Sequence, residues 1–209
     1  MKGSSFMLEK GFVYLDEYIP GIRWDAKYAT NDNFTGRPVK GYSVNRVVIH
    51  EKAAEAVKKA QEIFLKDGYC ILAYDAYRPV RAVNDFLNWM NEPEDNKRKA
   101  IHYPNIDKKD MLRLGYVAGK SGHSRGSTID LTLINSKTGK KLDMGGIFDL
   151  MDERSHTLSR QITDEQLKNR LYLRKVMLEC GFTDYDCEWW HFRLIDEAFT
   201  DTYFDFVIE

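Results

Sequence analysis

The sequence predicts an α+β fold in one domain over residues 1–209, with a central antiparallel sheet and helices packed around it. Helical and strand patterns both occur, but they do not alternate in the strict order of a parallel α/β fold. The chain has 209 residues, of which 43% are hydrophobic. That length and composition suit one well-buried core, whereas two full domains would be cramped.

Three segments carry the helical pattern. Apolar residues recur at three- and four-residue steps in residues 51–67 and again in residues 80–91, which predicts two amphipathic helices. Thr163 and Gln166 have the spacing of a capping box. They predict the start of a third helix that runs to about residue 180.

Residues 70–74 form an apolar run that is typical of a buried strand, and residues 189–194 are expected to form the last strand. Residues 128–134, with the sequence TIDLTLI, alternate strictly and predict a strand with one apolar and one polar face. Residues 142–162 are expected to be a long ordered loop. The charged stretch at residues 95–99 is expected to be a solvated loop.

Bulk composition excludes several classes of protein. The net charge is −1, from 31 basic and 32 acidic residues, so no basic nucleic-acid surface is expected. No apolar run is long enough to span a membrane, and no signal-peptide core is visible near the first residue. The three cysteines do not suggest a disulfide framework. We therefore expect a cytoplasmic protein without nucleic-acid or membrane partners, and no pattern addresses its oligomeric state.

Two segments place metal-binding side chains in unusual surroundings. His123 lies in a turn of small residues, and Asp130 follows within the apolar strand, where a carboxylate is costly to bury without a cation. His191 lies among aromatic residues, three positions after Glu188. Taken singly, the first motif also fits a turn-capping aspartate with a core histidine, and the second also fits an exposed glutamate with a histidine stacked on a tryptophan. Together, His123, Asp130 and His191 supply the three protein ligands of a catalytic zinc site, and Glu188 remains as a general base.

The spacing of Glu188 and His191 limits how their side chains can lie relative to each other. In a regular strand, residues three positions apart face opposite sides. The two side chains can share a cavity only if a bulge or a strand end lies between them. A further candidate is Arg78, which follows the predicted strand at residues 70–74 and could bind an oxyanion or a carboxylate, or else form a surface pair with an aspartate.

These motifs, in this order, resemble the VanX-type D-alanyl-D-alanine dipeptidases of the zinc D,D-peptidase family, a family that also contains D,D-carboxypeptidases. The resemblance covers nearly the whole chain. The matching segments are RWDAKYATNDNFTG (23–36), AYRPVRAVNDF (76–86), YPNID (103–107), GYVAGKSGHSRGSTIDLTL (115–133), MGGIFDLMDERSHT (144–157), EWWHFRL (188–194) and YFDF (203–206).

The resemblance implies the hedgehog-like fold of the D,D-peptidases, one zinc ion per chain, and a role for each matching residue. His123, Asp130 and His191 would bind zinc, Glu188 would act as general base and acid, and Arg78 would stabilise the tetrahedral intermediate. Asp149 is the candidate for binding the substrate ammonium. The residues implied in substrate binding or support of the site are Tyr28, Asp75, Ser121 and Asp149.

The implied reaction is hydrolysis of a small D,D-dipeptide, D-Ala-D-Ala, to two D-alanines, in glycopeptide resistance or in recycling of wall dipeptide. Three alternatives stay open: a D,D-carboxypeptidase acting on longer wall peptides, a non-catalytic zinc module that binds partners, and a dipeptidase of broad or L-specific scope. The preference for D-amino acids follows from the resemblance alone.

Overall fold

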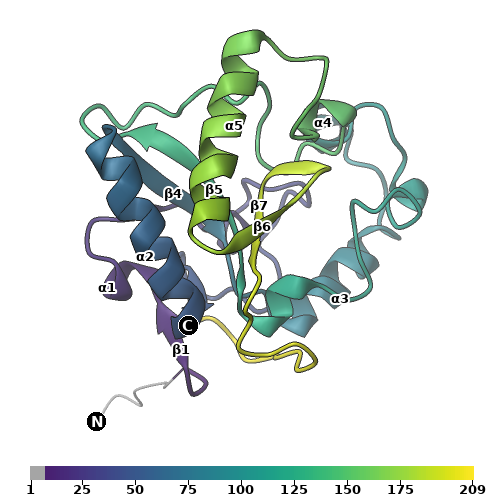
Figure 1. Ribbon diagram of the computed structural model, residues 1–209. Coiled ribbons are helices and arrows are strands. Elements are labelled where there is room, and N and C mark those ends of the chain that lie inside the picture. Colours follow the sequence, from purple (N-terminus) through teal and green to yellow (C-terminus); the bar gives the residue numbers. More distant parts are fainter. Residues whose placement is uncertain (1–7) are drawn as a thin grey trace.

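A five-stranded sheet with the strand order β2-β4-β5-β7-β6 forms the centre of the computed structural model, which describes residues 8–209 (Figure 1). Neighbouring strands are antiparallel, except that the two-residue β2 pairs in parallel with β4. The α+β class is confirmed, and the sheet is mixed because of this one short edge strand. The strands are β2 (Arg23–Trp24), β4 (Tyr69–Asp75), β5 (Thr128–Asn135), β6 (Phe182–Tyr185) and β7 (Glu188–Leu194).

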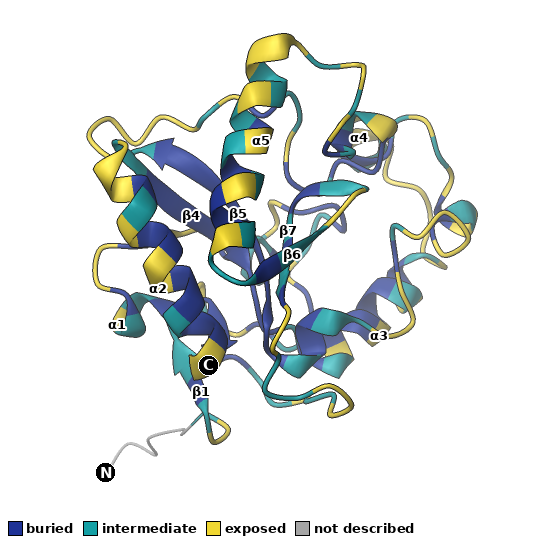
Figure 2. Ribbon diagram, in the orientation of Figure 1, coloured by how far each residue is buried: buried dark blue, intermediate teal, exposed yellow. Residues whose placement is uncertain are grey.

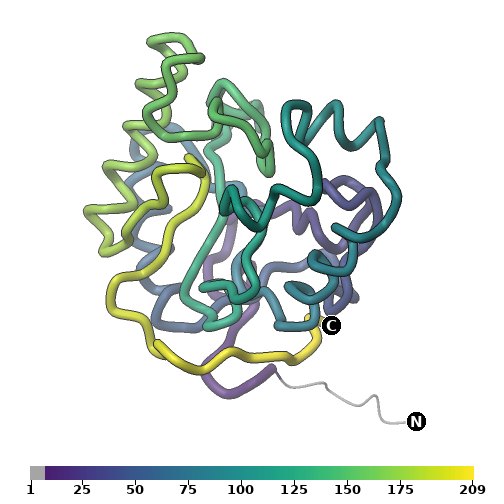
Figure 3. The backbone as a smooth tube through the Cα atoms, turned by 90° about the vertical axis from the view of Figure 1, so that its right-hand side faces the viewer, coloured from purple at the N-terminus to yellow at the C-terminus, as the bar shows by residue number. Residues whose placement is uncertain are grey.

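Helices cover both faces of this sheet. The long helices α2 (Glu51–Lys66) and α5 (Asp164–Glu179) lie on one face, and the chain from α3 (Val80–Trp89) through α4 (Asn96–His102) lies on the other (Figures 1 and 3). Within residues 8–209, no helix has both the length and the apolar character needed to cross a bilayer. The remaining elements are β1 (Phe12–Tyr14), α1 (Leu15–Tyr18), β3 (Val48–His50) and the 3-10 helices η1 (Lys27–Ala29), η2 (Lys108–Asp110), η3 (Gly122–Arg125) and η4 (Glu153–Ser155).

The predicted helices form where their patterns place them. The apolar stripe of α2 is fully buried, and Gly68, with a φ of 83°, follows the end of that helix. At the start of α5, the Gln166 amide donates to Thr163 Oγ1 at 3.3 Å, and the Thr163 amide donates to Gln166 Oε1 at 2.9 Å. The capping box is therefore confirmed, and it satisfies two amide groups that the first turn of the helix leaves unpaired.

Strand β5 has two different faces, as its alternation predicts. Ile129, Leu131 and Leu133 are completely buried on one face. Asp130 and Thr132 lie on the other face and are also almost completely buried. The ribbon of β5 is accordingly coloured as buried along most of its length (Figure 2). The polar face of β5 is thus shielded from water although it carries a carboxylate.

One predicted loop is a helix. The stretch at residues 95–99 was expected to be a solvated loop, but Asn96–His102 forms α4, and the Asp95 carboxylate accepts hydrogen bonds from the Lys97 and Arg98 amides. The helix has only seven residues and its exposed side is highly charged, so it has no apolar stripe to reveal it. The sequence signal for this helix is Asp95, which has the residue type preferred at an N-cap.

Gly126 ends η3, the short helix that carries His123. Its φ is 86°, and a Cβ atom there would lie 2.3 Å from the Phe12 ring. We expect Gly126→Ala to lower the free energy of unfolding by about 2–4 kcal/mol, because backbone strain and overpacking add. Urea denaturation measures the loss. The matched control is Gly139→Ala: its φ is 70°, no atom lies within 4 Å of the added methyl group, and only the strain applies. Equal losses in the two variants would contradict the role of the Phe12 contact.

Candidate active site

Three adjacent strands bring polar side chains into a row across the sheet. Asp75 on β4 pairs with Asp130 on β5, and Asp130 pairs with His191 on β7. Residues directly opposite one another on neighbouring strands have side chains in contact. The His191 Nδ1 atom accordingly lies 3.1 Å from Asp130 Oδ1. Segments that are distant in sequence thus meet in one place through strand register alone.

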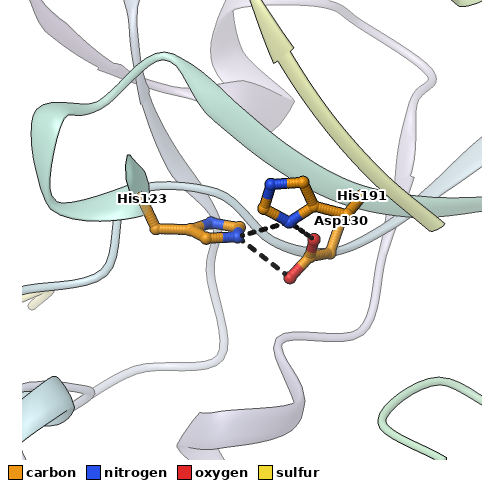
Figure 4. Close-up of side chains that lie close together, drawn as sticks. All are labelled: His123, Asp130 and His191. Carbon is orange, nitrogen blue, oxygen red and sulfur yellow. Dashed lines mark hydrogen bonds and ion pairs between the residues drawn. The ribbon is translucent and has the colours of Figure 1, made fainter. Parts of the chain in front are cut away.

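His123 approaches this row from η3, outside the sheet (Figure 4). Its Nδ1 atom lies 2.7 Å from the Ala76 carbonyl oxygen. A carbonyl can only accept a hydrogen bond, so Nδ1 carries the proton and Nε2 presents a lone pair. That Nε2 atom lies 3.2 Å from His191 Nδ1 and 3.3 Å from Asp130 Oδ2.

The three side chains fit a metal ion. Two atoms bound to one ion at about 2.0–2.2 Å cannot be more than about 4.4 Å apart. The three pairwise distances, 3.1, 3.2 and 3.3 Å, all meet this condition. His123 and Asp130 are 3% and 2% exposed, and acceptor atoms packed this closely away from water need a cation or a proton among them. His123, Asp130 and His191 could therefore hold one metal ion.

The surroundings set the protonation of these groups. Burial lowers the pKa of His123 to about 4, so this imidazole is neutral at pH 7, as a metal ligand must be. Burial alone would raise the pKa of Asp130, but the imidazoles of His123 and His191 lower it below its usual value. Burial alone would lower the pKa of His191, and hydrogen bonding to Asp130 raises it.

Glu188 lies beside the same cluster because β7 is irregular. Tyr185 pairs with Glu188, while the preceding residue of β6, Asp184, pairs with Phe192. Three residues of β7 therefore have no partner on β6, and the expected bulge between Glu188 and His191 is confirmed. Glu188 Oε2 lies 3.6 Å from His191 Nδ1, and burial raises the pKa of Glu188 to about 7.

Arg78 bridges the two aspartates that face each other across β4 and β5. Its Nε atom donates to Asp75 Oδ2 at 2.9 Å, and its Nη2 atom donates to Asp130 Oδ2 at 3.4 Å. The Tyr42 hydroxyl donates to the other oxygen of Asp75 at 2.7 Å. Burial raises the pKa of Asp75 to about 7, and the guanidinium opposes that rise. Asp75 thus orients the Arg78 guanidinium, and Tyr42 in turn holds the Asp75 carboxylate in place.

A cleft of about 260 Å³ opens over these groups. Tyr28 and Asp149 line it, and the Tyr28 hydroxyl donates to Asp149 Oδ2 at 2.7 Å. Burial raises the pKa of Asp149, and within residues 8–209 no lysine or arginine forms an ion pair with it. Ser121 lies at the rim and caps η3 by accepting from the His123 amide at 3.3 Å. The cleft is small, at the lower end of the range for ligand sites.

All the residues that the sequence predicts for the site lie at this cleft, except Asp75, which lies behind Arg78. Tyr42 is a contact that the sequence does not predict, because nothing in its local sequence links it to Asp75. Apart from Tyr28, the aromatic residues of the cleft were not predicted either, although the tryptophans next to His191 were a visible signal. The aromatic residues that line the cleft are Tyr28, Phe34, Phe86, Tyr116, Tyr185 and Trp190.

Known proteins are related to this chain in sequence along most of its length. The family model described as D-ala-D-ala dipeptidase matches residues 8–209. The D-alanyl-D-alanine dipeptidase of Enterococcus faecium is 52% identical over 202 residues, covering 97% of this chain and all of the relative. The enzyme of the same name from Streptomyces coelicolor is 52% identical over 94% of this chain and 98% of its own length. The one from Escherichia coli is 35% identical over 89% and 86%. With this agreement over nearly all of its length, the chain belongs to the D-Ala-D-Ala dipeptidase family of metallopeptidases.

Proposed function

We propose that this protein is a zinc-dependent dipeptidase that hydrolyses D-Ala-D-Ala to two D-alanines. The observation that carries the proposal is the convergence of His123, Asp130 and His191, with Glu188 beside them, in a member of this family. Three ligands with an adjacent carboxylate are typical of catalytic metal sites, whereas structural zinc sites use four protein ligands. The ligand number therefore favours an enzyme over the alternative of a non-catalytic zinc module.

Zinc is the proposed metal because the ligand set consists of two imidazoles and one carboxylate, a combination that recurs in zinc peptidases. When bound, zinc lowers the pKa of a coordinated water to about 7 and polarises a substrate carbonyl. The protein supplies the remaining parts of the reaction: a proton carrier, a cation for the developing charge, and groups that bind the ends of the substrate.

Glu188 is the proposed proton carrier. Its carboxylate lies next to the ligand atoms, and burial raises its pKa to about 7. A group with a pKa near the working pH can both accept and release a proton. Glu188 would take a proton from the attacking water and give it to the departing amine of the second alanine. The Glu188 carboxylate would thus act first as the base and then as the acid.

Arg78 is the proposed electrostatic partner of the reacting carbonyl. It is buried, with 14% of its side chain exposed, and it lines the cleft. Asp75 and Asp130 engage Nε and Nη2, and within residues 8–209 Nη1 has no hydrogen-bond partner. A preorganised donor of this kind stabilises negative charge on the carbonyl oxygen as the bond to water forms. Asp75 and Tyr42 would hold it in position.

Asp149 and Tyr28 are proposed to bind the amine end of the dipeptide, with Ser121 as a further polar contact. Among residues 8–209, no cationic side chain forms an ion pair with Asp149 at the cleft, so a substrate ammonium would complete its interactions. Recognition of a free amine next to the scissile bond restricts the substrate to a dipeptide. A D,D-carboxypeptidase would need space for a longer chain at this end.

Turnover of three matched peptides tests the proposal. We expect D-Ala-D-Ala to be hydrolysed, and N-acetyl-D-Ala-D-Ala to have a kcat/KM at least about 100-fold lower, because acylation removes the charge and leaves Asp149 unpaired. L-Ala-L-Ala tests the chirality, and metal content is measured on the same sample. Equal turnover of the acetylated peptide would support the carboxypeptidase alternative. No turnover of any peptide by the zinc-loaded protein would refute the peptidase proposal.

We also propose that the protein works in the cytoplasm. Cys70, Cys180 and Cys187 are all unpaired, and the last two are partly exposed. Free thiols of this kind suit a reducing compartment.

A further inference from the structure

His102, the last residue of α4, contacts the main chain of the loop that carries Asp149. Its Nδ1 atom lies 3.2 Å from the Asp149 carbonyl oxygen. Its own carbonyl oxygen accepts a hydrogen bond from the Met151 amide at 2.7 Å. His102 thus contacts the main chain of this loop at Asp149 and at Met151, on both sides of Leu150.

Asp149 has a backbone conformation that requires such support. Its φ is 59°, and within residues 8–209 it is the one non-glycine residue with a positive φ. Side chains with a Cβ atom disfavour this region, and residues held there depend on the surrounding structure. The Tyr28 hydroxyl contacts the Asp149 carboxylate, but this bond restrains the side chain and leaves the main chain to other contacts.

The protonation of His102 is defined by its surroundings. The residue is 5% exposed, and burial lowers its pKa to about 4, so the ring is neutral at pH 7. A neutral imidazole has one N–H group, and the Asp149 carbonyl can only accept. Nδ1–H is therefore the donor. His102 lines a separate cavity together with Phe148 and Trp189, so it contacts Asp149 from behind and lies outside the catalytic cleft.

We propose that His102 is a positioning residue that holds Asp149 in the geometry needed to bind the substrate ammonium. The inference rests on the proposed function, in which Asp149 is the amine-binding group. His102 touches neither the reacting carbonyl nor the metal ligands. Its loss should therefore weaken substrate binding and leave the chemical step unchanged, which separates it from Glu188 and Arg78.

Two substitutions at residue 102 separate hydrogen bonding from packing. His102→Leu removes the donor, whereas the side-chain amide of His102→Asn can place an N–H near the position of Nδ1. We expect His102→Leu to raise KM for D-Ala-D-Ala about tenfold, equivalent to about 1.4 kcal/mol, with kcat changed less than about twofold. His102→Asn should restore KM to within about threefold of the parent value. An unchanged KM in His102→Leu would overturn the proposal.

A double-mutant cycle tests whether His102 acts through Asp149. In an Asp149→Asn background, His102→Leu should raise KM less than about twofold further, because coupled residues are not additive. The structural control is Asp95→Ala, which removes the N-cap of α4 and loosens the helix without touching either contact to the loop. A full tenfold effect in the Asp149→Asn background, or an equal rise in KM for Asp95→Ala, would reduce His102 to a role in helix stability.

Amide hydrogen exchange provides a readout that does not depend on turnover. The amides of Leu150 and Met151 should lose protection in His102→Leu and regain it in His102→Asn. If the parent protein fails to hydrolyse D-Ala-D-Ala, the proposed function falls, and this exchange pattern still decides whether His102 holds the loop. Unchanged protection in His102→Leu would refute the positioning role even in an active enzyme.

Discussion

Glu188→Gln is expected to lower kcat by about 10³-fold while the protein still binds its metal. The amide has nearly the same size as the carboxylate, so the shape of the cleft is preserved, but it cannot accept a proton. Glu188 is not one of the three converging ligands. D-Alanine release gives the kinetic parameters, and metal analysis of the same preparation shows whether binding is intact.

The matched control for this experiment is Glu165→Gln. Glu165 is an exposed residue in the first turn of α5 and does not line the cleft. Replacing its carboxylate with an amide should therefore leave kcat unchanged. Full activity in Glu188→Gln would remove Glu188 from the mechanism. Loss of metal from that variant would instead indicate that Glu188 is a ligand.

His123→Ala is expected to weaken metal affinity at least about 100-fold and to abolish turnover, since even partners of the ligands are worth 10–100-fold. The substitution removes Nε2, which lies within 3.3 Å of both other ligands. Competition with a chelator measures the affinity. In the parent protein, the chelator should remove activity and added zinc should restore it.

His156→Ala is the control for histidine replacement. Its contribution to the fold includes a main-chain carbonyl that accepts from Arg170 at 2.7 Å, which alanine preserves. It does not line the catalytic cleft, so the variant should keep its metal. One tightly bound metal ion in His123→Ala would contradict the ligand assignment.

The sequence predicts the elements whose residues interact locally. The alternation in β5 and the capping box of α5 depend on neighbours in the chain, and both appear in the structure as expected. The two-residue β2 and the short helix α4 carry too few residues to produce a pattern. The proposed ligands were recognisable because a histidine or carboxylate among small or apolar residues is chemically unusual.

The contacts that orient the site depend on the tertiary structure. Nothing near Tyr42 in the sequence indicates that its hydroxyl reaches Asp75, 33 residues away. The left-handed conformation of Asp149 is likewise invisible, because aspartate rarely adopts it and glycine would be the usual signal. The candidate reactive groups were thus easier to predict from the sequence than the residues that hold them in place.

The unpaired residues of β7 have a consequence for how this family can diverge. Glu188 and His191 share one cavity only because the backbone between them departs from the regular pleat. Adding or deleting one residue in this interval would turn either Glu188, the proposed proton carrier, or His191, a proposed ligand, out of the cavity, whatever side chains were chosen. The number of residues between these two groups is therefore not free to drift, and the buried side chains of Trp189 and Trp190 add a packing constraint of their own.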